Sequence, residues 1–497
     1  MINVKLNREE FAYDIHSLVK AFYPAEDVNV CALEQTREHR SGREEQPVIL
    51  LISILFDEEG IESRMTQPDG SELLCERVTA DGLADRKTAR NVLKTLLYRQ
   101  LVHITGKQLP WGNLTGIRPT KIPMDLLEEG WKEEDIPAYM QEHYFVSAKK
   151  ADLALRTASR EKKILDRIPY RDGYSLYIGI PFCPSICLYC SFSSSPLAVW
   201  KDRVDDYLSA LIREIGESAH LFDGYALQSI YIGGGTPTTL EPRQMDRLLC
   251  AVERFFDRDQ VLEFTVEAGR PDTITADKLK VLRDHGISRI SINPQTMNQK
   301  TLDVIGRRHT VDEIREAYAL AREMGFDNIN MDTIIGLPGE GIDEVRYTME
   351  ELAKLQPENI TVHSLALKRA ARLSMQKDQY RGIAFHSSDQ IMDLTRQICE
   401  ENGLYPYYLY RQKNMAGNFE NVGYAKPGKE GLYNILIMEE VQSILALGAG
   451  ASTKLVEADG LIERIENVKD ISNYIDRIDE MIRRKQVIPG KVRRNAD

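Results

Sequence analysis

The chain has 497 residues, of which 42% are hydrophobic and 28% charged, and its formal net charge at pH 7 is −12. Such a chain can bury a core large enough to fold without disulfide bonds. The acidic balance argues against a nucleic-acid partner, and the charged start of the chain excludes a signal peptide. The longest apolar run, residues 48–56, is too short to span a membrane. We therefore expect a cytoplasmic protein of about two to four domains.

Residues 1–165 predict an N-terminal α+β domain whose role the sequence does not give. Apolar runs favour strands at 3–6, 28–33, 47–56 and 61–66, with a helix at 9–22 between the first two. From residue 85 to 168 the pattern is mostly helical. The segment PWGNLTGIRPTK at 110–121 interrupts it, because Pro and Gly break helices there.

Residues 166–365 alternate between short β-rich runs and amphipathic helices. We expect strands at 175–180, 229–232, 263–267, 289–293, 328–334 and 359–364. The helices between them are expected at 202–219, 244–256, 275–285, 311–324 and 341–355. Six successive βα units predict an α/β fold with a parallel sheet, open or closed into a barrel. In such sheets the chemistry lies at the C-terminal ends of the strands.

The remaining residues, 366–497, predict a mostly helical C-terminal part. A Tyr-rich stretch at 405–410 indicates packing, residues 413–429 look like a loop, and 448–451 form a turn of small residues. The chain ends in a basic segment that is typical of a solvated tail.

Three of the seven cysteines fall in the segment IPFCPSICLYC, directly after the first strand of the βα series. Without an export signal, such clustering indicates metal binding or catalysis rather than disulfides. Cys183, Cys187 and Cys190 can hold three irons of a [4Fe–4S] cluster and leave the fourth iron open to another ligand. A structural zinc site would normally take four protein ligands, and no further Cys or His lies nearby in sequence.

A run of three glycines, Gly233, Gly234 and Gly235, follows the second predicted strand and precedes Thr236. Glycines let the backbone approach a ligand closely and leave amide and carbonyl groups accessible. Such a run by itself is as typical of a tight turn as of a binding site. Its place one βα unit after the cysteine loop favours a ligand site.

Polar residues also mark the ends of three successive strands. Glu267 ends the third strand, Gln295 follows the fourth, and Asp332 lies within the fifth. Burying a carboxylate is costly unless it is paired, so each could serve only as a cap or a buried hydrogen-bonding group. Three on successive strands predict ligands that face the inside of the sheet. Arg307 is a candidate for binding a carboxylate.

The cysteine spacing resembles the signature of the radical S-adenosylmethionine superfamily. The segments LYIGIPFCPSICLYCSF, YIGGGTPT, RISINPQT, IGRRH and NMDTIIGLP are similar to those of the oxygen-independent coproporphyrinogen III oxidase family, which includes HemW-type heme chaperones and HemZ-type proteins. The resemblance covers about residues 165–455. The N-terminal segment WGNLTGIRPTK resembles the HemZ-type branch, the coproporphyrinogen dehydrogenases.

The resemblance implies a six-unit partial (βα) barrel at 166–365, with the added domain at 1–165 and a substrate-covering region at 366–497. Cys183, Cys187 and Cys190 would hold a [4Fe–4S] cluster, which cleaves S-adenosylmethionine to give a 5′-deoxyadenosyl radical. Position by position, the implied contacts of S-adenosylmethionine are Gly234, Gly235, Thr236, Glu267, Gln295, Arg307 and Asp332. Tyr177, which precedes the cluster loop, is the implied catalytic residue.

The family reaction is the oxidative decarboxylation of two propionates of coproporphyrinogen III, which gives protoporphyrinogen IX. The resemblance thus implies a porphyrinogen substrate and an electron donor of the flavodoxin or ferredoxin type. The propionates favour cationic neighbours, and the candidates are Arg307, Lys368, Arg369 and Arg411. Tyr405, Tyr407, Tyr408 and Tyr410 are candidates for ring contacts.

Three functions stay open at this point, because the chain departs from its relatives in places. Gly179 stands where the family usually has histidine, and Phe192 where established oxidases have a fourth cysteine. The stretch at 433–438 replaces the HNxxYW motif of the chaperones. The chain is therefore expected to be a decarboxylating oxidoreductase, with a HemW-like heme chaperone or a radical enzyme with another substrate as alternatives.

Overall fold

The computed structural model describes residues 1–33, 47–79, 82–191, 194–366, 388–412, 419–457 and 460–492. These residues fold as two compact units, each with its own main sheet. The first unit comprises residues 1–155 with 411–419, and the second comprises residues 156–410 with 420–497.

The first unit is built on a five-stranded sheet of order β2-β1-β3-β4-β5. β1 is parallel to β2 and β3, whereas β4 runs antiparallel to both of its neighbours, β3 and β5. Ile2, Val4 and Leu6 of β1 are fully buried, in one core with Leu18 and Phe22 of α1. The elements are β1 (Ile2–Leu6), α1 (Ala12–Phe22), β2 (Val28–Ala32), β3 (Leu50–Phe56), β4 (Ile61–Thr66), β5 (Glu72–Val78), α2 (Arg86–Thr105), α3 (Lys121–Glu128), α4 (Ile136–Tyr144) and, reaching into the second unit, α5 (Ala148–Leu165).

The predicted strands and helices of this part are present, and residues 110–120 form the predicted loop before α3. The helix expected at 9–22 is a short 3-10 turn followed by α1. β5 was missed, because its sequence ELLCERV mixes charged and apolar residues without strict alternation.

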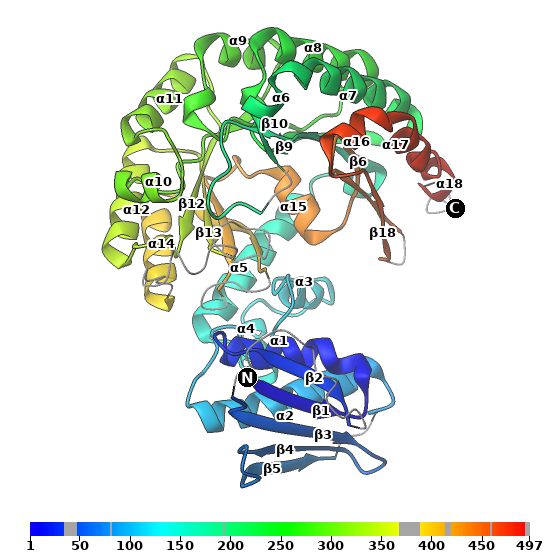
Figure 1. Ribbon diagram of the computed structural model, residues 1–497, viewed down its shortest axis with the longest axis vertical. Coiled ribbons are helices and arrows are strands. Elements are labelled where there is room, and N and C mark those ends of the chain that lie inside the picture. The colour runs from blue at the N-terminus through cyan, green and yellow to red at the C-terminus, as the bar shows by residue number, and fades with distance from the viewer. Residues whose placement is uncertain are drawn as a thin grey trace. The chain divides into compact units, whose positions relative to one another are not determined.

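The second unit contains an eleven-stranded sheet of order β14-β15-β13-β12-β11-β10-β9-β6-β16-β17-β18. Its centre is six parallel strands in chain order, β6 (Gly173–Ile180), β9 (Ala226–Gly234), β10 (Glu263–Glu267), β11 (Arg289–Ser291), β12 (Ile329–Ile335) and β13 (Asn359–Ser364). The helices that follow them form an arc outside the strands (Figure 1). These are α7 (Val204–Ser218), α8 (Pro242–Phe255), α9 (Ala276–Asp284), α10 (Gln299–Val304), α11 (Val311–Glu323) and α12 (Ile342–Leu355).

The predicted partial (βα) barrel of six units is therefore confirmed, with strand and helix bounds within a few residues of those expected. Three short elements follow the first strand: β7 (Phe182–Cys183), β8 (Ser195–Pro196) and α6 (Leu197–Trp200). Because all six strands are parallel, their C-terminal ends lie along one edge of the sheet. The loop that carries the three cysteines (residues 181–190, the cysteine loop) and the turn of three glycines (residues 233–235, the glycine turn) both lie at that edge.

The C-terminal part combines helices with strands, which corrects the expectation of a mostly helical region. The described residues contain α14 (Asp389–Glu401), β14 (Tyr405–Tyr410), β15 (Asn421–Ala425), α15 (Leu432–Glu439), β16 (Ser443–Leu447), β17 (Ser452–Val456), β18 (Ile462–Glu466), α16 (Ile471–Asp476), α17 (Ile478–Lys485) and α18 (Ile488–Val492). β14 and β16 are almost entirely buried, so their sequences lack the polar alternation that marks a half-exposed strand. β15 lies in the segment expected to be a loop.

No helix in the described parts of the chain is long and apolar enough to cross a membrane. The expected turn at 448–451 is present and connects β16 to β17.

A buried carboxylate, Glu214 of α7, joins the C-terminal elements to the barrel. Its oxygens accept hydrogen bonds from Lys485 Nζ (2.7 Å), Asn467 Nδ2 (2.7 Å) and Tyr474 Oη (2.6 Å). The backbone N–H of Gly448 also donates to it, at 2.8 Å. The side chains of Glu214 and Lys485 are both fully buried. A buried ion pair of this kind persists when its other hydrogen-bonding groups are also satisfied.

The same network reaches the first strand of the barrel. The Tyr207 hydroxyl donates to the carbonyl of Gly179 on β6 (2.7 Å) and accepts the N–H of Ala449 (3.1 Å). The 448–451 turn is thus held against the strand that precedes the cysteine loop.

Replacing Lys485 with methionine is expected to lower the free energy of unfolding by about 3–5 kcal/mol, because Glu214 would stay buried without its counter-charge. Urea denaturation measures the change. Arg483→Met, at an exposed position of the same helix, is the matched control and should change stability by less than about 0.5 kcal/mol. Equal midpoints for the two variants would contradict the role assigned to the ion pair.

Candidate active site

The three cysteines lie on one loop after β6. Cys183 is in β7, and the N–H of Cys190 donates to the carbonyl of Cys187 (3.1 Å), which closes a turn between them. The loop is held from outside by the N–H of Leu188, which donates to the carbonyl of Ile305 (2.9 Å). Cys187 is buried, Cys183 and Cys190 are half-buried, and all three are free thiols. The loop therefore offers three sulfur ligands.

The glycine turn is hydrogen-bonded to the cysteine loop. The N–H groups of Gly235 and Thr236 donate to the carbonyls of Ile180 and Phe182, both at 2.7 Å. A Cβ at position 235 would lie 2.5 Å from the Phe182 carbonyl oxygen, so this approach requires glycine. Gly234 has a φ of +110°, which side chains rarely adopt. The Thr236 hydroxyl oxygen lies 3.6 Å from the sulfur of Cys183.

Three tyrosine rings stack beside this turn on the inner face of the sheet. The ring centroids of Tyr231 and Tyr433 are 4.5 Å apart, and those of Tyr177 and Tyr231 are 6.2 Å apart. Burial raises the pKa of Tyr177, so this phenol stays protonated. Tyr177 is thus one ring of a packed aromatic wall.

Glu267 ends β10 next to this wall. Its Oε1 accepts a hydrogen bond from the hydroxyl of Tyr231 at 2.5 Å. Burial, reinforced by the nearby carboxylate of Asp332, raises the pKa of Glu267 to about 7. The Tyr231 hydroxyl and the N–H of Gly234 favour the charged form and limit this rise.

The surroundings of Asp332 on β12 lower its pKa, whereas those of Glu267 raise it. Its Oδ1 accepts a hydrogen bond from Asn330 Nδ2 (2.7 Å), and His363 Nε2 lies 3.7 Å from its Oδ2. Burial opposes ionisation, but His363 and Asn330 together hold the pKa of Asp332 below its usual value. The site therefore pairs an ionised carboxylate with one that titrates near neutrality, an arrangement typical of functional sites.

Gln295 has a φ of +68°, which is uncommon for a residue other than glycine. Strand β12 holds this conformation, because the N–H of Gln295 donates to the Asp332 carbonyl and its own carbonyl accepts the N–H of Ile334, both at 2.9 Å. The side-chain oxygens of Gln295 and Asn293 are buried and have no hydrogen-bond partner among the residues that the structure describes. Buried polar atoms are rarely left unpaired, so these oxygens fit the amino or hydroxyl groups of a ligand.

Two buried guanidinium groups lie against the cysteine loop. Arg270 Nη1 is 3.8 Å from the sulfur of Cys187, and Asp272 holds this guanidinium through contacts of 2.9 and 2.8 Å. Arg307 donates to the backbone carbonyl of Asn293. Although its burial opposes the charge, Tyr189 and Cys187 raise the pKa of Arg307. Two buried cations thus lie beside the buried cysteine of the loop.

Residues 177–352 match the model of the Radical SAM superfamily. The chain is also 43% identical over 399 residues to the oxygen-independent coproporphyrinogen-III oxidase-like protein HemZ of Bacillus subtilis (strain 168), and the alignment covers 79% of each chain. The chain belongs to the HemZ family of radical S-adenosylmethionine enzymes. It is thus an oxidoreductase that uses an iron–sulfur cluster and S-adenosylmethionine.

Two further relatives align with a smaller share of the chain. The heme chaperone HemW of Bacillus subtilis (strain 168) is 32% identical over 309 residues, which are 62% of this chain and 76% of the chaperone. The solved structure of the coproporphyrinogen III oxidase HemN from Escherichia coli aligns with a TM-score of 0.50 and 24% identity, over 65% of this chain and 73% of that chain. The HemN structure supports the fold assignment of this family member.

The residues present fit both cofactors of the family. Three thiols without a nearby fourth are the donor set of a [4Fe–4S] cluster with one open iron. The unpaired oxygens of Gln295 and Asn293, with Glu267 and Asp332 beside them, offer polar contacts for S-adenosylmethionine. When bound, the two cofactors together supply the organic radical that starts the chemistry.

Several contacts of this site were not predicted from the sequence. The only sequence signal for Arg270 is its place in the Gly-Arg-Pro segment after the third strand. The only signal for Tyr231 is that it lies two residues before Gly233 and therefore on the same face of β9. Tyr433 comes from α15 and has no local signal. At Gly179 a Cβ would meet Tyr177 and the Leu447 carbonyl at 3.5 Å, an ordinary contact distance, so a side chain is not excluded there by sterics.

Arg411, Tyr407 and Tyr408, which were predicted as substrate contacts, are buried in packing interactions of the protein itself. Arg411 is buried in the first unit, where its Nη1 donates to the carbonyl of Leu114 (2.6 Å) and its guanidinium lies over the ring of Trp111. It therefore stabilises the 110–120 loop of that unit. Tyr407 and Tyr408 are buried in a core cluster of the second unit, as expected for packing residues. Lys368, Arg369 and Phe192 lie outside the described residues.

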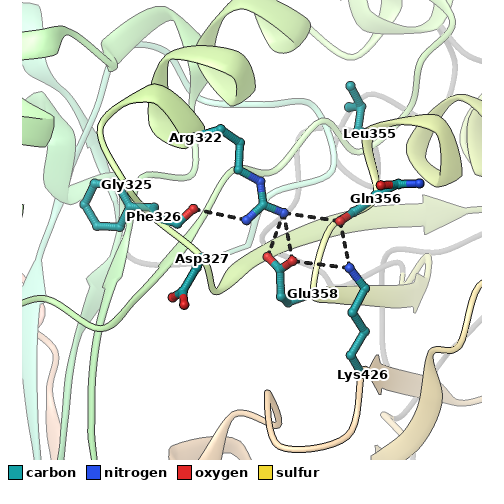
Figure 2. Close-up of a pocket in the computed structure, with 8 residues that line it drawn as sticks. All are labelled: Arg322, Gly325, Phe326, Asp327, Leu355, Gln356, Glu358 and Lys426. Carbon is teal, nitrogen blue, oxygen red and sulfur yellow. Dashed lines mark hydrogen bonds and ion pairs between the residues drawn. The ribbon is translucent and has the colours of Figure 1, made fainter.

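A pocket of about 410 Å³ lies at the opposite end of the strands (Figure 2). Its lining residues precede β12 or β13, apart from Lys426, which follows the antiparallel strand β15, whereas the cysteine loop follows β6. Arg322 and Lys426 both pair with Glu358 there, at 2.8 and 3.3 Å. The charges of this pocket are thus satisfied within the protein, and it is not the candidate active site.

Replacing Cys187 with alanine is expected to abolish cluster assembly, because two thiols remain where three are needed. Iron and sulfide analysis after anaerobic reconstitution measures the loss. Cys399→Ala removes another buried thiol that lies far along the chain, on α14, and should keep full iron content. Full cluster content in the Cys187 variant would refute the ligand assignment.

The raised pKa of Glu267 predicts a pH-dependent stability in the absence of S-adenosylmethionine. The folded pKa of about 7 exceeds the ordinary value of 4.5. The contribution of this group to stability is therefore fully present below pH 4.5 and is lost as pH rises through 7. Glu267→Gln should thus gain stability relative to the wild type between pH 5 and 8, by at most about 3 kcal/mol.

Urea denaturation at pH 5 and pH 8, with equal cluster content in both proteins, measures this difference. Glu323→Gln, at an exposed position of α11, is the control and should show no such change. A difference between Glu267→Gln and wild type that stays constant from pH 5 to 8 would argue against a raised pKa.

Proposed function

We propose that this enzyme decarboxylates propionate side chains of coproporphyrinogen III without oxygen and thereby forms protoporphyrinogen IX. The observation that carries the proposal is the extent of the HemZ alignment. It spans 399 residues and 79% of this chain, which is more than residues 156–497 can supply. It therefore includes part of the first unit, whereas the alignments that cover 62% and 65% of the chain are short enough to fit within residues 156–497.

In this proposal Cys183, Cys187 and Cys190 hold the cluster, and the polar inner face binds S-adenosylmethionine. The glycine turn with Gly234, Gly235 and Thr236 offers backbone groups next to the cluster. Glu267, Gln295 and Asp332 supply acceptors for the amino and hydroxyl groups of the cofactor, and Arg307 supplies a cation beside the loop.

The aromatic wall of Tyr177, Tyr231 and Tyr433 limits access of water to this space, which protects a reactive radical. We assign Tyr177 a positioning role, since its ring is packed and its phenol stays protonated. Lys368 and Arg369 are proposed to contact the propionates of the substrate, as the sequence predicts. The electron donor is proposed to be of the flavodoxin or ferredoxin type, and the reaction is placed in the cytoplasm.

A heme chaperone is the second candidate function. It is supported by the alignment with HemW, which covers 76% of that chaperone. The two candidates differ in whether porphyrinogen is consumed.

Anaerobic incubation of reconstituted protein with reductant, S-adenosylmethionine and coproporphyrinogen III should yield both 5′-deoxyadenosine and protoporphyrinogen IX. Asp332→Ala should bind S-adenosylmethionine about one to two decades more weakly, because it loses a charged hydrogen bond, and should keep its cluster. Asp327→Ala, an exposed carboxylate before the same strand, is the matched control.

The products separate the alternatives. Deoxyadenosine without protoporphyrinogen would indicate a radical enzyme with another substrate. Tight heme binding with neither product would indicate the chaperone.

A further inference from the structure

A second group of metal-ligating side chains comes from α8 and the end of α9. These two helices are neighbours in the outer layer (Figure 1). Asp246 and Cys250 are four residues apart on α8, so they project from the same side of that helix. His285 caps the C-terminal end of α9. Each of the three offers one ligand atom, and these atoms all lie within 4.8 Å of one another.

The imidazole of His285 is fixed between two carboxylates. Its side chain is 9% exposed, its Nε2 lies 3.0 Å from Asp246 Oδ1, and its Nδ1 lies 2.9 Å from Glu253 Oε1. The contact at Nδ1 does not complete a hydrogen bond in this structure. Asp246 and Cys250 are exposed, so a cation can reach the group from solvent.

Glu253 is itself held in place. Arg258 Nη2 donates to Glu253 Oε1 (2.8 Å), and Arg258 Nη1 donates to the backbone carbonyl of His285 (3.0 Å). Arg258 thus compensates the charge of Glu253 and fixes it beside Nδ1. Asp246 and Cys250 remain as the ligands on the Nε2 side.

This chemistry is that of a zinc site. Zinc binds thiolate, imidazole and carboxylate ligands, whereas calcium and magnesium prefer oxygen ligands alone. A histidine that binds zinc through one nitrogen commonly has the other oriented by a carboxylate. We propose that Asp246, Cys250 and His285 bind one Zn²⁺, with Glu253 as the orienting carboxylate and water as the fourth ligand.

A metal-free explanation exists for part of this geometry. A protonated His285 would pair with Asp246 and Glu253 without any metal, but this pairing would not involve the Cys250 thiol. Cys250 is therefore the residue on which the test depends.

The site lies away from the cysteine loop. His285 is four residues before Arg289, the first residue of β11, whereas the cysteines follow the C-terminal end of β6. β11 has three residues and is the shortest of the six parallel strands. A metal that joins α8 to α9 would fix the segment that leads into this strand, which gives the site a stabilising role independent of radical chemistry.

The test is equilibrium dialysis of the cluster-loaded protein against Zn²⁺ under anaerobic conditions, with zinc and iron counted in the same samples. Wild type should bind one zinc per chain while its iron content stays constant. Cys250→Ser and Asp246→Asn should bind zinc at least about 100-fold more weakly. Glu253→Gln should keep the stoichiometry and lose about 10- to 100-fold in affinity.

Two controls match these variants. Asp284→Asn removes an exposed carboxylate next to His285 that pairs with Lys280, and Cys75→Ser removes a thiol of the first unit. Both should bind zinc as wild type does. X-ray absorption at the zinc edge should show one sulfur and otherwise nitrogen or oxygen ligands.

Unchanged zinc affinity in Cys250→Ser would overturn the proposal. So would a zinc spectrum with three sulfurs, since that would place the metal on the cysteine loop. The decarboxylation itself is tested separately, because cluster content and products are measured in the anaerobic assay.

Discussion

The site depends on how closely the glycine turn approaches the cysteine loop. β6 and β9 are parallel, with Ile180 opposite Gly234, and the hydrogen bonds to Ile180 and Phe182 continue this pairing beyond the strand ends. Only glycine fits at position 235, because a Cβ would overlap the Phe182 carbonyl. This approach brings the hydroxyl of Thr236 to Cys183. The proposed cluster ligands and the proposed backbone contacts of S-adenosylmethionine therefore share one corner of the sheet.

The inner face of the barrel carries polar side chains at a considerable energetic cost. A parallel sheet covered on both faces is normally apolar throughout, and burying a polar group without a partner costs about 1–3 kcal/mol. Here Tyr231 pairs with Glu267 and Asn330 with Asp332, but the oxygens of Gln295 and Asn293 have no partner in the described part of the chain. Burial raises the pKa of Glu267, whereas at Asp332 the interactions with His363 and Asn330 outweigh burial and lower the pKa. A bound cofactor with amino and hydroxyl groups would relieve this cost, which supports the proposal that the polar inner face binds S-adenosylmethionine.

Where the sequence predicted the structure, local patterns were sufficient. The six core strands alternate apolar outward residues with polar or aromatic inward ones. The three cysteines fall within eight residues, and the three glycines are consecutive. β14 and β16 were missed because burial on both faces removes this alternation. Tyr433 and Arg270 were missed for another reason. Their place in the site depends on α15 and on the loop after β10, and no local pattern reports how these segments pack across the sheet.

The two groups of metal ligands differ in ways that keep their metals apart. The cysteine loop offers three thiols at the C-terminal ends of the strands, where loops are free to carry chemistry. The α8–α9 group offers one thiol, one imidazole and one carboxylate near the N-terminal end of β11, the side of the barrel associated with stability. Three thiolates select an iron–sulfur cluster, whereas the mixed set suits a single zinc ion. The two ligand sets share no residue and lie at opposite ends of the strands. Binding of a metal to one set therefore does not require a change in the other. A zinc ion that stabilises the barrel wall beside β11 can support a reactive site at the opposite edge of the sheet.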